Sequence, residues 1–174
     1  YGGIREFMGW KGAVISDSGG FQVMTQIKKF PNRGKVTDDG ATFHPLGEEK
    51  VMLTPEKSVE FQMGLKSDMV VVLDDFTDPK ANYEEARETI ERTIKWAKRS
   101  KAEFEKICKQ KKLNENNRPY LLGVVQGADF LDLREECTER LVEIGFDGLG
   151  YGGWPIMSDG KFNYEVAECI VKNA

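Results

Sequence analysis

The sequence predicts an α/β protein that forms part of an irregular (β/α)8 barrel. Four short apolar runs each end in polar or glycine-rich residues, and helical patterns alternate with them. Buried parallel strands have this valine-, isoleucine- and leucine-rich character, and alternation with helices indicates parallel pairing. In a βα barrel the residues at the carboxyl ends of the strands converge on one pocket. The four runs are residues 13–15, 70–73, 121–125 and 146–150.

The length of 174 residues is short for this fold, because a complete barrel takes about 250 residues. We therefore expect residues 1–174 to be a partial (β/α)8 barrel catalytic domain from a longer protein. The chain opens on Tyr1 almost directly before a strand, and it stops within a helical pattern. A partial barrel exposes sheet edges and apolar faces, so we expect the isolated segment to be unstable.

Three helices are predicted between and after the strands. The Thr-Pro-Glu sequence at residues 54–56 supplies a capping hydroxyl, a proline and a first-turn acid, which start a helix that runs to about Leu65. A longer helix is predicted from about Tyr83 to Lys111, where apolar residues recur at three- and four-residue steps. A third apolar stripe ends at Gly145, a suitable C′ residue. This stripe comprises Phe130, Leu133, Cys137, Leu141 and Ile144.

One stretch, Asn32 to Met52, interrupts the alternation with short β-like pieces. We interpret it as a β-hairpin inserted after the first strand, on the side of a barrel where loops carry function. The only histidine, His44, lies here, and a surface or packing role is commoner for such a residue than a catalytic one. The turn-forming residues of the stretch are Gly34, Gly40, Pro45 and Gly47.

The composition, with 40% hydrophobic and 31% charged residues, is that of a globular protein. No apolar run approaches the roughly 20 residues that span a bilayer, so no membrane association is expected. Three widely spaced cysteines form neither a metal half-site nor a disulfide framework, which favours a cytoplasmic setting. The net charge of −4 gives no general attraction for nucleic acid. A local basic group is compatible with either phosphate contacts or a solvated loop: Lys28, Lys29, Arg33 and Lys35.

The residues that follow the strands suit a guanine-like base. Such a base presents adjacent N–H donors, which Asp74 can accept in a charge-assisted fork. Gln126 and the backbone around Gly152 and Gly153 can donate to the neighbouring carbonyl, since glycine lets a ligand approach the main chain. Phe21 offers a stacking face, an interaction of about 1–3 kcal/mol per base.

Asp17 supplies a second carboxylate at a strand end. In a dry pocket near Asp74 it can exchange protons with a ring nitrogen of the base. Each motif also has a simpler interpretation: the segment after Asp17 as a capped turn, and the glycine pairs as ordinary turns. Asp75 is expected to face solvent at a helix start. Because these motifs all lie at the ends of successive strands, the interpretation that they form one pocket is favoured.

Four segments of the chain resemble the tRNA-guanine transglycosylases, the queuine tRNA-ribosyltransferase family. They occur in the family's order, and together they cover nearly the entire chain. Asp-Ser-Gly-Gly-Phe-Gln and the Thr-Pro-Glu helix start are highly specific motifs. The segments are Ile15–Met24, Leu53–Gln62, Val124–Gly127 and Ile144–Gly148, the last followed by Gly152 and Gly153.

The resemblance implies an irregular barrel with a zinc subdomain, and a pentosyltransferase that exchanges guanine in tRNA for a 7-deazaguanine: preQ1, queuine or preQ0. The anticodon wobble position is expected, with the D-loop as the other site used in the family. In this chemistry an aspartate attacks the ribose anomeric carbon, guanine leaves, and the deazaguanine displaces the enzyme. The chain offers no counterpart of that aspartate or of the Cys-x-Cys-x-x-Cys and His ligands of Zn²⁺, so both are expected in the full-length protein.

The resemblance also implies roles for individual residues. Asp17 is similar to the family's general acid/base, and Phe21 to its stacking ring. Asp74, Gln126 and Gly153, with the neighbouring Gly152, correspond to the base-recognition set. The loop that holds the base comprises Asp17, Ser18, Gly19, Gly20 and Phe21.

Two departures from the family pattern concern the substrate. Phe76 stands where bacterial members commonly have a cysteine, and a Trp-Pro-Ile sequence at residues 154–156 replaces Leu-Ala-Val. Both changes make the walls of the pocket bulkier. A bulkier wall favours a smaller deazaguanine, although a rotated ring would open a different space.

Other functions remain open from the sequence. A noncatalytic base-binding protein or partner subunit would keep Asp74 and Gln126 but lack the nucleophile. A glycoside hydrolase would use Asp17 and Asp74 as its acid pair, but the aromatic ring and glycines suit a planar base better. DNA in place of tRNA, and a homodimer or heterodimer, are also compatible with the sequence.

Overall fold

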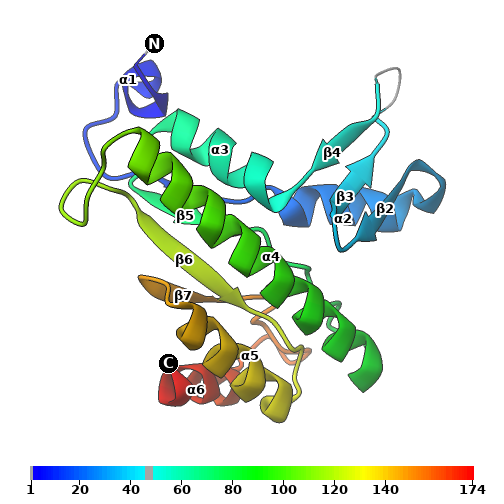
Figure 1. Ribbon diagram of the computed structural model, residues 1–174. Helices are drawn as coiled ribbons and strands as arrows, with labels where there is room; N and C mark the ends of the chain where they lie inside the picture. The colour runs from blue at the N-terminus through cyan, green and yellow to red at the C-terminus, as the bar shows by residue number, and fades with distance from the viewer. Residues whose placement is uncertain (1, 46–48) are drawn as a thin grey trace.

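The computed structural model describes residues 2–45 and 49–174. Its main element is a parallel sheet with strand order β1-β5-β6-β7, packed against helices (Figure 1). The α/β class and the parallel pairing predicted from the sequence are confirmed. The four strands are β1 (Ile15–Ser16), β5 (Met69–Val71), β6 (Tyr120–Val125) and β7 (Gly148–Tyr151).

The three predicted helices are present, and a fourth follows β7. Thr54 caps the first of them by accepting the Lys57 N–H, and Asn82 forms a reciprocal capping box with Glu85 at the start of the next. Gly145, in the left-handed conformation at φ 82°, ends the third as predicted. These helices are α3 (Pro55–Leu65), α4 (Tyr83–Gln110), α5 (Leu131–Ile144) and α6 (Tyr164–Asn173).

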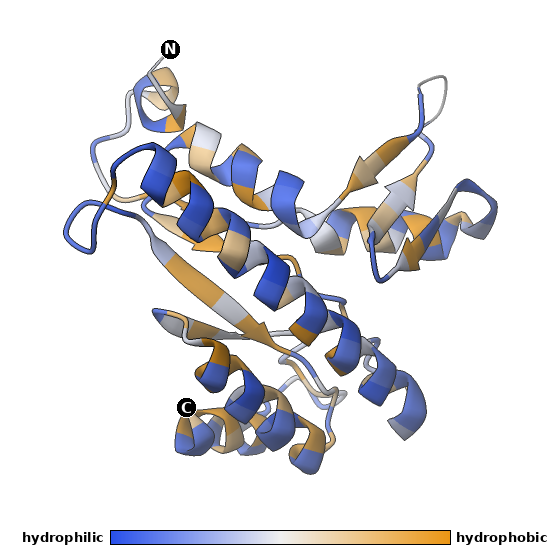
Figure 2. Ribbon diagram, viewed as in Figure 1, coloured by the Kyte–Doolittle hydropathy of each residue, from blue (hydrophilic) through white to orange (hydrophobic). Residues whose placement is uncertain are grey.

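The core lies between the parallel sheet and these helices, which pack side by side in chain order. Val70 and Leu121 face this core, whereas their neighbours Val71 and Leu122 line a pocket, because successive residues of a strand point to opposite faces. Helix α4 presents a hydrophilic outer surface (Figure 2). No helix of the described ranges combines the length and the apolar character needed to cross a membrane. The apolar stripe of α4 comprises Ala86, Ile90, Ile94, Ala97, Phe104 and Ile107.

A second, antiparallel sheet of strand order β2-β3-β4 occupies the segment where the sequence predicts an inserted hairpin. A turn at Asp38 and Asp39 joins β2 to β3, and β4 pairs with the edge of β3 that lies opposite β2. Gly47 of the predicted hairpin lies outside the described residues. The elements are a 3₁₀ turn (Pro31–Arg33), β2 (Gly34–Thr37), β3 (Gly40–Phe43) and β4 (Val51–Leu53).

Two helices have no counterpart in the sequence prediction: α1 (Ile4–Met8) and α2 (Gly20–Lys29). Helix α2 begins directly after the loop that holds Asp17, so Lys28 lies on a helix rather than in the solvated loop considered above. Its ammonium group forms an ion pair with Asp78 at 2.9 Å.

Candidate active site

A pocket of about 390 Å³ opens where the carboxyl ends of the four parallel strands meet. The first turn after β1, the loop after β5, strand β6 and the segment after β7 each contribute to its lining. The strand ends therefore lie together in the folded chain. Of the catalytic and base-binding residues predicted from the sequence, those that line this pocket are Asp17, Ser18, Phe21, Asp74 and Gly153.

The loop after β1 is shaped by two glycines that lie outside the pocket lining. Gly19 has φ 79°, a left-handed conformation that glycine adopts without strain. At Gly20, the first residue of α2, a Cβ would come within 2.7 Å of the Leu73 Cδ1. The chain can thus turn from β1 straight into α2, which places the half-exposed ring of Phe21 beside Asp17 in the pocket.

Asp74 lies in the pocket wall and accepts a hydrogen bond from the Gln126 Nε2 at 2.5 Å. Burial raises the pKa of Asp74 to about 7; the Gln126 hydrogen bond opposes this rise, while the charges of Asp17 and Asp75 add to it. This carboxyl group can therefore gain or lose a proton near neutral pH.

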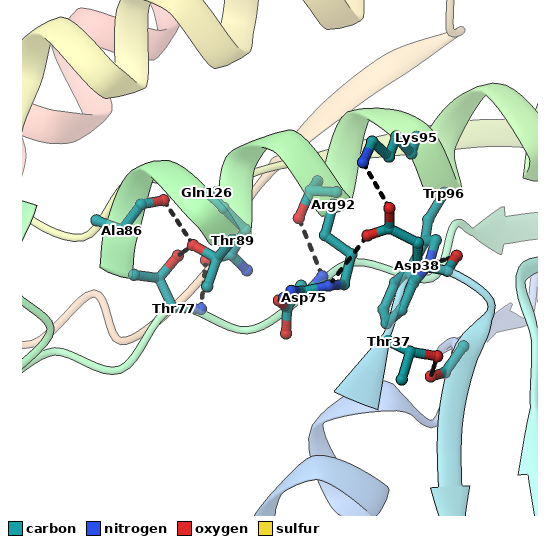
Figure 3. Close-up of polar contacts among 12 residues, drawn as sticks. Thr37, Asp38, Asp75, Thr77, Ala86, Thr89, Arg92, Lys95, Trp96 and Gln126 are labelled. Atoms are coloured by element: carbon teal, nitrogen blue, oxygen red, sulfur yellow. Dashed lines mark hydrogen bonds and ion pairs between the residues drawn. The ribbon is translucent and has the colours of Figure 1, made fainter. Parts of the chain in front are cut away.

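Gln126 is fully buried behind Asp74 and does not itself line the pocket. Its Oε1 accepts the backbone N–H of Thr77 at 3.1 Å, and the hydroxyls of Thr77 and Thr89 are hydrogen-bonded at 2.5 Å (Figure 3). With the oxygen held in this way, the amide nitrogen is the end that faces Asp74. The side chain therefore offers hydrogen-bond donors toward the site.

The two glycines after β7 differ in their roles. At Gly152 a Cβ would lie 2.6 Å from both the Gln126 Nε2 and the Val125 carbonyl oxygen, so a larger residue would displace the amide. Gly153 lines the pocket and has φ 87°, a left-handed conformation. Both positions require glycine, the first for space and the second for backbone conformation.

Arg134 of α5 helps to build the site, although the sequence patterns above did not single it out. Its side chain is only 1% exposed, and it donates to the carbonyl oxygens of Val125, Ala128 and Gly152 at 2.6, 2.7 and 2.9 Å. It thereby ties the end of β6 to the end of β7. An arginine within the apolar stripe of α5 is the sequence feature that indicates such a buried role.

Asp75 is buried, so the prediction that it faces solvent is wrong. Its side chain forms an ion pair with Arg92 of α4, and its backbone N–H donates to the Thr93 Oγ1 at 3.0 Å (Figure 3). Arg92 also lies 3.6 Å from Asp38 in the β2–β3 turn. The reason for the error is that α4 passes directly over the loop after β5 and brings a cation to the carboxylate.

Phe76 forms an aromatic wall between the pocket and α2. Its ring meets that of Phe21 edge-on, with centroids 5.0 Å apart, and the Lys28 Nζ lies 5.5 Å from its centroid. Trp154 and Pro155 complete the bulky part of the lining. Phe76, Trp154 and Pro155, which depart from the family pattern, therefore line the same pocket.

Other candidate residues lie outside this pocket. His44 is exposed, and Cys108, Cys137 and Cys169 are free thiols. In residues 2–45 and 49–174 no group of three or more histidine, cysteine or acidic side chains could hold a metal ion. The described residues thus do not fit zinc, and Zn²⁺ in the full-length protein stays a prediction.

Comparison with known proteins identifies relatives along the whole chain. A family model described as queuine tRNA-ribosyltransferase matches residues 1–174. The queuine tRNA-ribosyltransferase of Aeromonas hydrophila is 40% identical over 154 residues, which cover 88% of this chain and 38% of the relative. That of Thermotoga neapolitana is 39% identical over 173 residues, which cover 99% of this chain and 43% of the relative. The chain thus spans about two fifths of the length of these curated relatives.

Proposed function

Because the chain belongs to the queuine tRNA-ribosyltransferase family, we propose that the full-length protein is a tRNA-guanine transglycosylase. It exchanges guanine at the anticodon wobble position of tRNA for a 7-deazaguanine through a covalent enzyme–RNA intermediate. The observation that carries this proposal is the presence of two carboxylates, Asp17 and Asp74, in one pocket at the strand ends.

Base recognition is assigned to the wall around Asp74. Its ionised carboxylate accepts the two adjacent donors of a guanine-like base. Gln126 holds that carboxylate in place through its amide N–H, and the backbone around Gly153 donates to the carbonyl of the base. Phe21 stacks on the ring, and Gly152 leaves the space that the amide of Gln126 needs.

Asp17 is proposed as the general acid/base. As a bond forms between an aspartate oxygen and the ribose anomeric carbon, the bond from that carbon to guanine breaks, and the leaving base takes up a proton that Asp17 can supply. The incoming deazaguanine returns a proton to Asp17 as it displaces the enzyme. We expect the nucleophilic aspartate on a later strand of the barrel.

We also propose the architecture of the full-length protein from its membership of this family. The four parallel strands would be part of an irregular (β/α)8 barrel, with residues 1–174 in its catalytic domain and the antiparallel sheet inserted after the first strand. The strand order, which follows the order along the chain, supports this arrangement. A zinc subdomain, a homodimer or heterodimer and a cytoplasmic location are further predictions for the full-length protein.

The bulky wall formed by Phe76 and Trp154 supports a preference for a small 7-substituent. We expect faster turnover with preQ1 than with queuine. Comparable turnover of the two bases would contradict this preference.

The proposed activity is tested by incubating the full-length protein with radiolabelled guanine and unmodified tRNA. Incorporation of label into tRNA is the expected result, and a duplex DNA of the same sequence serves as the matched substrate control. Guanine binding without incorporation would favour a noncatalytic partner subunit. Neither binding nor incorporation would contradict the function and reopen the glycoside hydrolase alternative.

A further inference from the structure

Strand β1 is only two residues long, and a glutamine side chain takes the place of its continuation. Ile15 and Ser16 pair with the start of β5, and the chain then leaves the sheet at Asp17. Val71 of β5 would be the partner of Asp17 in a longer ladder. Instead the Val71 N–H donates to the Gln62 Oε1 at 3.0 Å, and the Val71 carbonyl accepts from the Gln62 Nε2 at 2.8 Å.

The glutamine and a serine one helical turn earlier on α3 also bind the loop itself. The Ser16 Oγ donates to the Gln62 Oε1 at 2.9 Å, and the Gln62 Nε2 donates to the Ser58 Oγ at 3.2 Å. The Ser58 Oγ in turn donates to the Ser18 carbonyl at 2.9 Å. Ser58 and Gln62 are 2% and 1% exposed, so these two side chains are closed off from solvent, whereas Ser16 is half-buried.

Because the Gln62 side chain pairs with Val71 in place of a longer β1, the Ser18 N–H has a different hydrogen-bond acceptor. In a continuing parallel ladder the Val71 carbonyl would accept that N–H. In this structure that carbonyl accepts from Gln62, and the Ser18 N–H donates instead to the carboxylate of Asp17 at 2.7 Å. The loop can therefore leave the sheet with no backbone group of Val71 unpaired, and Asp17 reaches the pocket.

We propose that Gln62 and Ser58 are positioning residues that hold Asp17 for proton transfer in the base exchange. The inference rests on the proposed function, because it assigns these residues to the same site. They act through the loop and do not line the pocket, so they should affect turnover more than recognition of the base by Asp74.

The test compares Gln62→Leu and Ser58→Ala with wild type in the full-length protein. Calorimetry with guanine gives the dissociation constant and the number of binding-competent sites, and the exchange assay then gives kcat per site. Because small misplacements of a catalytic group are costly, we expect Gln62→Leu to lower kcat per site about tenfold or more and Ser58→Ala about threefold. The guanine dissociation constant should stay within about twofold in both.

Gln110→Leu is the matched control, since Gln110 is an exposed residue at the end of α4; it should leave both quantities unchanged. A purely structural role would reduce the number of sites but not kcat per site, and that result would overturn the proposal. If Gln62→Leu does not fold, Ser58→Ala alone tests the positioning role, because that variant retains both hydrogen bonds between Gln62 and Val71. Absence of exchange in wild type would refute the proposed function, whereas active wild type with unaffected variants would refute only the positioning role.

Discussion

Gln126 donates a hydrogen bond to Asp74 while its amide oxygen is held by the Thr77 N–H. A flip of the amide would lose both interactions, so the orientation of Asp74 is set by a buried side chain that directly follows β6. The same carboxyl group has a pKa of about 7 because burial disfavours its charge. Recognition of the base and the protonation state of the pocket are therefore linked through one residue.

Guanine binding should depend on pH through the carboxyl group of Asp74. If the ionised form of Asp74 accepts the donors of the base, affinity for guanine should weaken as pH falls below about 7, by about tenfold per pH unit well below the pKa. Calorimetry from pH 5 to pH 8 measures this. In Asp74→Asn the affinity should be low at every pH; an unchanged affinity in that variant would contradict the assignment.

Stability should depend on pH in the opposite sense. The pKa of Asp74 is about 7 in the folded protein and close to 4 in an unfolded chain, so between these values the folded state binds more protons. The Asp74 contribution is thus fully present below pH 4 and is lost as pH rises through 7. Thermal midpoints across this range should fall with pH more steeply in wild type than in Asp74→Asn. Parallel curves would refute the raised pKa.

Gly152→Ala should impair recognition of the base without touching the ligand. The new Cβ would lie 2.6 Å from the Gln126 Nε2 and push the amide away from Asp74. Loss of one hydrogen bond to a charged group corresponds to about a tenfold or greater loss of guanine affinity. Gly64→Ala in α3, where a Cβ meets nothing within 4 Å, is the control and should bind guanine like wild type. Equal affinities in both variants would show that the amide position is unimportant.

Arg92→Met should destabilise the fold strongly, because it leaves the buried Asp75 without its cation. Removal of one partner from a buried ion pair costs about 3 kcal/mol, and the double variant with Asp75→Asn should recover most of it. Lys28→Met breaks the exposed pair with Asp78 and should cost less than about 1 kcal/mol. Chemical denaturation measures all three. Similar losses for Arg92→Met and Lys28→Met would contradict the burial of Asp75.

The fold was predictable where local signals and parallel geometry agree. Short apolar runs identified the strands, and the Thr54 cap and the Gly145 terminus identified helix ends, because these features depend on nearby residues. The convergence of Asp17 and Asp74 followed from the rule that parallel strands end on one side of a sheet.

Features set by distant partners were not predictable in this way. Asp75 is buried because Arg92 of α4 lies over it, and a single sequence does not reveal that contact. Gln62 lies in a helix that was correctly predicted, but its role depends on β1 ending after two residues. Helix α2 starts with glycine and follows a turn motif, so its sequence favours a loop until tertiary packing buries Met24 and Ile27.

Guanine exchange into tRNA by full-length Asp17→Asn measures whether Asp17 transfers the proton in the base exchange. Asparagine retains an oxygen to accept the Ser18 N–H, so the loop should keep its shape while losing the proton-transfer group. Asp39→Asn, on the exposed β2–β3 turn, controls for the change of charge. We expect wild-type exchange in Asp39→Asn and a loss of at least about a hundredfold in Asp17→Asn. Exchange at the wild-type rate in Asp17→Asn would contradict proton transfer by Asp17.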